Sequence, residues 1–374
     1  MQIEGYVSPG FEPVADAFAE NFTVRGDRGA ACAVMIDGEL VVDIHGGAAT
    51  AGKPWNTATR SVVFSVSKGV TTICLLMAAE RGLVDLDEPV ATYWPEFGAC
   101  GKDMVTVREL LAHRTGLIAP EHDHTADDVE KWFPVVDGLA AQDPMWTPGT
   151  TFAYHPLTFG WLAGEVLRRA TGKRPAEWLA QEITGPLGLS TTFGTAPNDP
   201  DLAPILPPTT AGDGIPGSVE ELGLQERSMG MGGAFSGDPF LAFNTETCLR
   251  AEIPAANLVT SARDLATLYS ATVSDVDGVR LTGSEIIARA REPISSGAPF
   301  FGPDQGNVWA TGFMVHSRRR GMAGPGSFGH DGAGGQLAFA HPDLRLGFGY
   351  QTVQAGGDDD LRSEILSTAL RACL

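Results

Sequence analysis

The sequence has few cysteines, few basic residues and no long apolar run. Its five cysteines among 374 residues stand far apart without a C-x-x-C pair, so they fit reduced thiols rather than a disulfide framework. Only 26 lysines and arginines oppose 46 acidic residues, a formal net charge of −20 that disfavours a nucleic-acid partner, since phosphate binding needs clustered basic side chains. No apolar run reaches the ~18 residues that a membrane-spanning helix needs. We therefore predict neither a nucleic-acid nor a membrane partner.

Several motifs of location and catalysis are also missing. Residues 1–10 lack the basic segment and apolar run of a secretory signal, so a cytoplasmic location is expected. The absence of G-x-S-x-G and H-E-x-x-H argues against an α/β-hydrolase and a zinc hydrolase. Glu121-His122-Asp123-His124 contains metal-ligand residue types, but adjacent ligands in a polar loop rarely converge on one ion. No metal and no cofactor is predicted.

The residues that are present indicate a folded chain with strands at both ends. A hydrophobic content of 43% supports a large core. Periodicity and turn signals predict an amphipathic helix near 11–22, a hairpin around Asp37-Gly38 and an apolar helix from 68 to 81 that is buried on every side and capped by Gly82. The remaining terminal predictions are hairpin strands at 31–36 and 40–44, late strands at 309–315, 336–340 and 345–353, and a closing helix at 358–374.

The middle of the chain has a different pattern. Residues 83–300 alternate short helical segments with Pro/Gly-rich loops, and 193–257 reads as a long surface loop system around a pocket. We therefore expect an α+β fold, in which an antiparallel sheet formed by both termini carries a mostly helical insertion. The predicted division is 1–82 with 301–374 as the sheet part and 83–300 as the helical part.

Ser65-Val66-Ser67-Lys68 is an S-x-x-K motif at the start of the predicted buried helix. One helical turn places Lys68 on the same face as Ser65, and the helix N-terminus adds partial positive charge and free N–H groups near the hydroxyl. A serine hydroxyl is a weak nucleophile and needs a partner to remove its proton. The motif therefore predicts Ser65 as a nucleophile with Lys68 as a proton carrier.

Two further segments complete the candidate site. Tyr154 is the candidate second proton carrier, and a nearby ammonium is expected to favour its phenolate and lower its pKa. The glycine-rich stretch 329–335 would let a strand backbone approach a substrate and aim an N–H group at a developing oxyanion. Either segment alone is also typical of ordinary structure, a core tyrosine or a glycine-rich turn.

Taken in order, these segments resemble the serine β-lactamase and penicillin-binding-protein superfamily, especially class C enzymes and family VIII carboxylesterases. The resemblance implies the β-lactamase-like fold, acylation of Ser65, proton transfer by Lys68 and Tyr154, and an oxyanion hole from the backbone N–H groups of Ser65 and Ala333. Residues of the third segment are then expected to bind substrate: His330, Gly332 and Gly334. Further matching segments are Leu110–Leu117, Pro148–Thr150, Gly160–Gly164 and Asn257–Asp264.

The sequence departs from class C enzymes at two places. Pro156 stands where their Tyr-x-Asn element has asparagine, and His330-Asp331-Gly332 replaces Lys-Thr-Gly. In that family the asparagine and lysine help to bind the β-lactam, so their loss favours an ester substrate. The prediction is thus a carboxylesterase for short- to medium-chain acyl esters. A β-lactamase or amidase, an acyltransferase and a non-catalytic binding protein are the alternatives.

Pocket shape and assembly are less constrained. Trp132, Trp146 and Trp309 could line the acyl pocket, although large aromatic side chains are by default core residues. The expected partner is a small-molecule ester. A homodimer is compatible with the sequence, but no visible interface pattern supports it.

Overall fold

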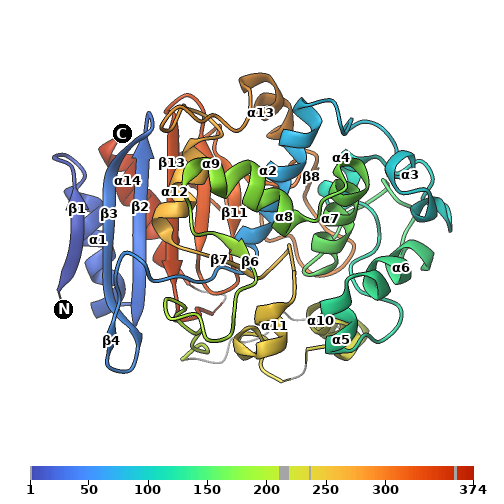
Figure 1. The fold of residues 1–374 in the computed structure, drawn as a ribbon, viewed down its shortest axis with the longest axis horizontal. Coiled ribbons are helices and arrows are strands. Elements are labelled where there is room, and N and C mark those ends of the chain that lie inside the picture. The colour runs from blue at the N-terminus through green and yellow to red at the C-terminus, as the bar shows by residue number, and fades with distance from the viewer. Residues whose placement is uncertain (1, 210–218, 236, 358–359) are drawn as a thin grey trace.

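The computed structural model describes residues 2–209, 219–235, 237–357 and 360–374. An antiparallel sheet stands beside a mainly helical region, as Figure 1 shows. The N-terminal and C-terminal segments meet in this sheet, and the chain between them forms most of the helical region. The predicted α+β architecture, an antiparallel sheet formed by both termini with a mostly helical insertion, is confirmed.

The large sheet joins strands from both ends of the chain. Its order is β1, β3, β2, β13, β12, β11, β10, β9, β8, with β4 paired to β3, and all its strand pairs are antiparallel. Strand β2 pairs with β13, from Ile36 opposite Leu346 to Ala30 opposite Thr352. This pairing joins the N-terminal strands to the C-terminal strands of the sheet. The strands are β1 Ile3–Val7, β2 Gly29–Ile36, β3 Glu39–Thr50, β4 Lys53–Pro54, β8 Ser295–Ser296, β9 Val308–Trp309, β10 Met314–Val315, β11 Phe328–Asp331, β12 Leu337–His341 and β13 Leu346–Thr352.

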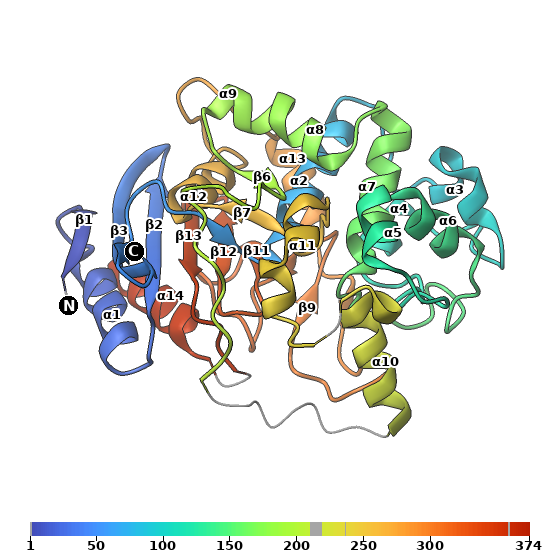
Figure 2. The same ribbon diagram turned by 60° about the horizontal axis from the view of Figure 1, so that its bottom comes forward.

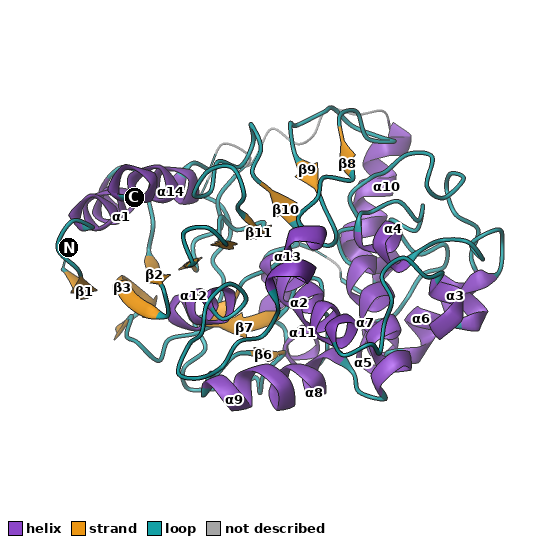
Figure 3. Ribbon diagram, turned by 90° about the horizontal axis from the view of Figure 1, so that it is seen from above, coloured by secondary structure: helices purple, strands orange, loops and turns teal. Residues whose placement is uncertain are grey.

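Helices cover both faces of this sheet. Helices α1 (Glu12–Thr23) and α14 (Arg362–Cys373) pack together on one face, and α12 (Ala262–Ser270) packs against β2 and β13 on the other (Figure 3). The side chains of β2 alternate accordingly, because Cys32 and Val34 belong to the core under α1 and α14 whereas Ala33 contacts α12. The small side of β2 thus allows the close approach of α12.

The helical region is built around α2 (Val66–Glu80). Residues 66–78 of this helix are all buried, as predicted, whereas residues 79–81 at the end of the predicted buried helix are partly or fully exposed. Helix α7 packs along α2. Three short strands, β5 (Ser61–Val62), β7 (Leu258–Thr260) and β6 (Thr192–Phe193), form a separate sheet that leads the chain into α2. Figure 2 shows the surrounding helices: α3 Val90–Tyr93, α4 Val107–Leu111, α5 Ala126–Lys131, α6 Phe133–Ala141, α7 Thr158–Thr171, α8 Pro175–Leu179, α9 Gly185–Leu187, α10 Val219–Gly230, α11 Glu246–Arg250 and α13 Ser284–Ala290.

Most of the predicted terminal elements are confirmed. The helix near 11–22 is α1, the buried helix is α2, and the hairpin between β2 and β3 turns at Asp37 and Gly38 with φ of 56° and 81°. The late strands at 336–340 and 345–353 are β12 and β13. The closing helix α14 begins later than predicted, at Arg362, and residues 358–359 of that prediction lie outside the described residues.

Two sequence predictions differ from the structure, and one strand was missed. Residues 193–257 are not only surface loops, because they contain α10 and α11, and 251–258 is a buried segment. The predicted strand at 309–315 is two short strands, β9 and β10, separated by a turn at Gly312 with φ of 73°. Strand β1 was not predicted, since its alternating pattern is weak and its middle residues are exposed.

The proposed division of the chain stays a prediction. Two elements from the segment 83–300 belong to the sheet layer, since α12 covers one face and β8 is the edge strand beside β9. No helix among the described residues is long and apolar enough to cross a bilayer.

The end of α2 generates a stability prediction. Gly82 follows the helix with φ of +72° in open space, so Gly82→Ala should lower the free energy of unfolding by about 1 kcal/mol through backbone strain alone. Gly223 of α10 is the matched control, since a Cβ there meets no atom within 4 Å and φ is not left-handed. Gly223→Ala should be neutral or stabilise by up to ~1 kcal/mol. Urea unfolding measures both, and unchanged stability of Gly82→Ala would contradict the prediction.

Candidate active site

Ser65 lies between β5 of the small sheet and the first turn of α2. Strand β5 ends at Val62, and Phe64 then adopts a left-handed φ of 46°, which turns the chain sharply into the helix. Its ring is held edge-on by Phe240 and Phe243, at centroid distances of 5.5 and 5.2 Å. Ser65 is the residue that caps α2, so its backbone N–H lies at the positive end of the helix dipole.

Lys68 lies one turn further along α2 and is completely buried. Its Nζ is 3.0 Å from Ser65 Oγ and also donates to the carbonyl oxygens of Pro156, at 2.7 Å, and Ala255, at 3.0 Å. Burial holds the pKa of Lys68 well below its usual range, and the charge of Asp331 opposes this only in part. A neutral amine has two N–H groups and one lone pair, which match two carbonyls and one serine hydroxyl.

Tyr154 approaches Ser65 from the loop before α7. Its hydroxyl donates to Ser65 Oγ at 2.7 Å, and its ring is stacked on Trp309 with centroids 5.0 Å apart. Burial raises the pKa of Tyr154 above its usual value. The expectation that a nearby ammonium lowers this pKa is therefore wrong, because desolvation outweighs the other influences on Tyr154, and the same burial favours the neutral amine of Lys68.

Residues far apart in the sequence thus meet at one oxygen. The structure brings Lys68 and Tyr154 within hydrogen-bond distance of Ser65 Oγ, as the motifs predicted. The S-x-x-K spacing carried the information for the first pair. The resemblance to the β-lactamase superfamily, rather than any local pattern, identified Tyr154.

The predicted oxyanion-hole donors face the same cavity. Ser65 and Ala333 both line it, and within the part of the chain that the structure describes neither backbone N–H donates to a protein acceptor. Ala333 lies in the turn between β11 and β12. The N–H of Gly332 donates to Gln336 O at 2.8 Å, which closes this turn with Ala333 inside it. Arg362 holds the far side of this turn by donating to Gly334 O at 3.1 Å. The turn therefore presents Ala333 toward Ser65.

The predicted substrate-binding residues lie behind this surface. None of His330, Gly332 and Gly334 lines the described cavity, and His330 is only 1% exposed. A Cβ at Gly332 would lie 2.5 Å from Val63 O, so this glycine allows the turn to pack against the segment before Ser65. Their contact with substrate stays a prediction.

Asp331, which sequence reasoning did not single out, does line the cavity beside Ala333. Arg320 forms an ion pair with it, with Arg320 Nε donating at 2.7 Å. Burial alone would raise the pKa of Asp331, but the charge of Arg320 and the hydrogen bond from His330 hold it below its usual range. The carboxylate is thus ionised and largely neutralised by its partner.

The cavity at Ser65 has a volume of about 300 Å³ and is predominantly apolar. Of the tryptophans considered, Trp309 lines it, whereas Trp132 donates to the buried Glu165 and Trp146 packs on Phe300. Sequence reasoning missed most of the residues that line this cavity, because the composition of a loop does not reveal which of its side chains face a cavity. The apolar lining side chains are Phe152, Pro156, Met229, Pro299, Phe301, Pro303, Trp309 and Met314.

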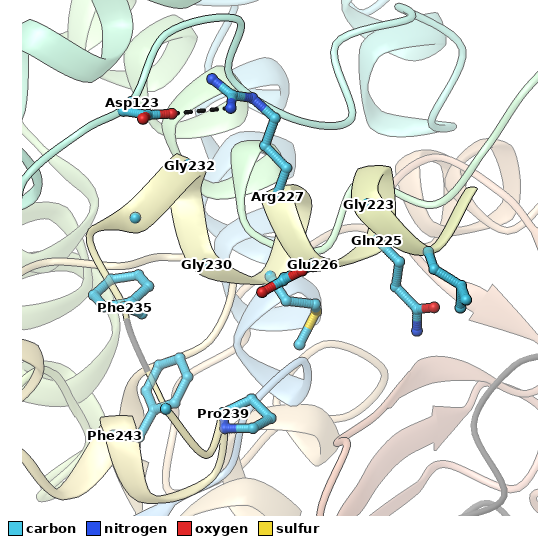
Figure 4. Close-up of a pocket in the computed structure, with 14 residues that line it drawn as sticks. Asp123, Gly223, Gln225, Glu226, Arg227, Gly230, Gly232, Phe235, Pro239 and Phe243 are labelled. Carbon is cyan, nitrogen blue, oxygen red and sulfur yellow. Dashed lines mark ion pairs between the residues drawn. The ribbon is translucent and has the colours of Figure 1, made fainter. Parts of the chain in front are cut away.

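A second cavity, of about 650 Å³, lies along α10 and is drawn in Figure 4. Arg227 of α10 forms an ion pair with Asp123 at 2.9 Å and donates to Pro120 O at 2.6 Å. The segment Glu121–His124 is therefore bound by an arginine. Among the described residues, no group of three or more His, Cys, Asp or Glu is placed to hold a metal ion.

Comparison with known proteins confirms the predicted β-lactamase-like fold. A family model described as Beta-lactamase matches residues 16–372. The chain is 34% identical over 363 residues to Esterase/beta-lactamase LipL of Mycobacterium tuberculosis (strain ATCC 25618 / H37Rv), covering 93% of this chain and 82% of that protein. A solved family VIII carboxylesterase is 32% identical with a TM-score of 0.89 and full coverage, 100%, of both chains. EstA from Arthrobacter nitroguajacolicus Rue61a is 31% identical with a TM-score of 0.87, covering 100% of this chain and 98% of that one. The chain therefore belongs to the β-lactamase family, as its motifs predicted, and is a serine hydrolase.

Proposed function

We propose that the protein is a carboxylesterase that hydrolyses uncharged short- to medium-chain acyl esters through an acyl-enzyme. The observation that carries the proposal is the contact of Ser65 Oγ with a buried amine, Lys68 Nζ at 3.0 Å, and a phenol, Tyr154 at 2.7 Å, beside an apolar cavity. The relatives named as a family VIII carboxylesterase and as an esterase/β-lactamase support this class.

Acylation begins when Ser65 Oγ attacks the ester carbonyl carbon. The neutral amine of Lys68 accepts the hydroxyl proton as the new C–O bond forms. The carbonyl oxygen becomes an oxyanion, and the N–H groups of Ser65 and Ala333 are its proposed donors. Collapse of this intermediate expels the alkoxide, which takes a proton from Tyr154. The proton held by Lys68 then restores the phenol.

Deacylation repeats these steps with water as the nucleophile. The amine of Lys68, neutral again, is the group that accepts the water proton through the Tyr154 hydroxyl. Water adds to the acyl carbon, and the intermediate collapses to release the acid and return a proton to Ser65 Oγ. Both half-reactions therefore need Lys68 neutral and Tyr154 protonated at the start, the states that burial favours.

The charges around the cavity support an uncharged substrate. Its ionisable lining residues, among those described, are Tyr154, Asp304 and Asp331, so no cationic side chain faces the acyl or alcohol group. A carboxylate on the substrate would meet like charge without a partner. An apolar acyl chain would instead contact the aromatic and proline side chains of the wall.

Hydrolysis of β-lactams is the second candidate function. It is favoured by the name of the 34% identical relative, esterase/β-lactamase. It is disfavoured by the carboxylate that β-lactam antibiotics carry, since the cavity offers that group no cation.

The five unpaired cysteines suit a reducing compartment, and a cytoplasmic location and a homodimer remain predictions.

Removing the nucleophile tests the assignment. Ser65→Ala should abolish the burst and turnover of p-nitrophenyl acetate and butyrate while leaving the unfolding transition intact, because no other group forms the acyl-enzyme. The chromogenic cephalosporin nitrocefin, assayed in parallel with wild-type enzyme, separates the two candidate functions. Ester turnover that persists in the variant would overturn the assignment, and faster cleavage of nitrocefin than of the esters would favour the second candidate.

The protonation state of Lys68 predicts the pH dependence. Only the neutral amine accepts the Ser65 proton, and burial places its pKa well below 10.5. Activity should therefore be full above this lowered pKa and fall about tenfold per pH unit once the pH drops below it. The measurement is kcat/KM for p-nitrophenyl acetate against pH, and a rise only near pH 10 would show that the amine is an ordinary ammonium.

The charge at the cavity predicts substrate preference. Asp304→Asn removes one exposed carboxylate of the lining while an amide oxygen can still accept from Gly306 N–H. It should raise kcat/KM for a mono-p-nitrophenyl succinate relative to p-nitrophenyl butyrate by about 2- to 10-fold at low salt. Asp16→Asn on α1 makes the same charge change at an exposed position outside the cavity lining and should leave the ratio unchanged. Equal ratios for the two variants would contradict the prediction.

A further inference from the structure

Tyr154 belongs to a loop without regular structure, so something other than a helix or strand must fix its hydroxyl. His113 makes contacts on both sides of it. The carbonyl oxygen of His113 accepts the N–H of Ala153 at 3.2 Å, and its ring Nδ1 accepts the N–H of His155, also at 3.2 Å. These donors are the residues immediately before and after Tyr154.

The ring of His113 also packs against the tyrosine. Its centroid is 5.0 Å from that of Tyr154 and 4.8 Å from that of Trp309, on which Tyr154 is stacked. His113 is 1% exposed, so these contacts exclude water from the back of the tyrosine. One histidine thus restrains the backbone of the loop at two points and the tyrosine ring at a third.

The protonation state of His113 is part of this arrangement. Nδ1 accepts a hydrogen bond only when it carries no proton, so the ring must be neutral with its proton on Nε2. Burial keeps the pKa of His113 well below its usual value. The neighbouring His155 carries its proton on the other nitrogen, since its Nδ1 donates to Ala153 O and its Nε2 accepts from the Thr115 hydroxyl, both at 2.7 Å.

We propose that His113 is a positioning residue that holds the Tyr154 hydroxyl against Ser65 Oγ, an inference that rests on the proposed function. Without the acceptor at Nδ1, the loop loses one of the two hydrogen bonds that flank Tyr154, and the 2.7 Å contact with Ser65 relaxes. A displacement of about 1 Å at a reacting group can cost ~100-fold in rate. Binding of the acyl chain depends on other residues and should change little.

The backbone of His113 suggests a conservative replacement. Its φ is 64°, a left-handed conformation that asparagine tolerates better than most residues. Asparagine also carries an acceptor, Oδ1, close to the position of Nδ1. His113→Asn should therefore retain the restraint, whereas His113→Ala and the bulkier His113→Leu lose the acceptor.

The experiment is a double-mutant cycle with Tyr154→Phe, measured as kcat and KM for p-nitrophenyl butyrate. Tyr154→Phe alone should lower kcat about 100- to 10000-fold. His113→Ala should lower kcat about 10- to 100-fold with KM changed less than ~3-fold, and by less than ~3-fold when Tyr154 is already Phe. His113→Asn should stay within ~3-fold of wild type. If His113→Ala does not fold, His113→Leu carries the same expectations.

Three results would overturn the proposal, and they are distinguishable. Equal losses from His113→Ala or His113→Leu in both backgrounds would mean that His113 supports the fold and not the tyrosine. Wild-type kcat in Tyr154→Phe would remove Tyr154 from the proposed mechanism, and the role of His113 with it. Failure of His113→Asn to restore kcat in a folded protein would equally exclude the acceptor as the cause.

Discussion

The structure around the site depends on how the buried amine of Lys68 is solvated. An ammonium without water costs several kcal/mol, so a lysine in this place survives by staying neutral and giving each N–H an acceptor. Both acceptors are backbone carbonyls, of Pro156 and Ala255, and they come from segments far apart in the chain. Hydrogen bonds from the amine therefore fix the loop of Tyr154 and the buried segment 251–258 beside Lys68. The remaining contact of the amine is the oxygen of Ser65.

This dependence explains what sequence reasoning could and could not reach. Hydrophobic periodicity located α2 and the terminal strands because burial decides those residue types, and S-x-x-K fixed the lysine relative to the serine by helical spacing. The carbonyls that accept hydrogen bonds from the amine belong to the backbone, so the residue types in the sequence do not reveal them. Pro156 was interpreted only as a missing asparagine, yet its oxygen accepts from Lys68. Segment 193–257 was misread for a similar reason, since Pro and Gly residues also occur in chain that is buried by neighbouring helices.

A second buried charge organises the opposite side of the site. Arg362 at the start of α14 forms ion pairs with Asp27 and Asp360 and reaches Gly334 O in the turn that carries Ala333. Asp27 also accepts from Tyr350 of β13 at 2.6 Å. Because such a group is costly to leave unpaired, it ties the last helix, the sheet and the turn into one arrangement. The geometry of a backbone N–H at the active site is thus set from the C-terminal end of the chain.

The pairing of β2 with β13 has a consequence for folding during translation. Strand β2 is translated long before β13, its partner in the sheet. Contacts between such distant segments form slowly and leave apolar edges open in the meantime. Ser65 is likewise translated long before the turn between β11 and β12 that carries Ala333, so the nascent chain holds the nucleophile well before the site can be complete.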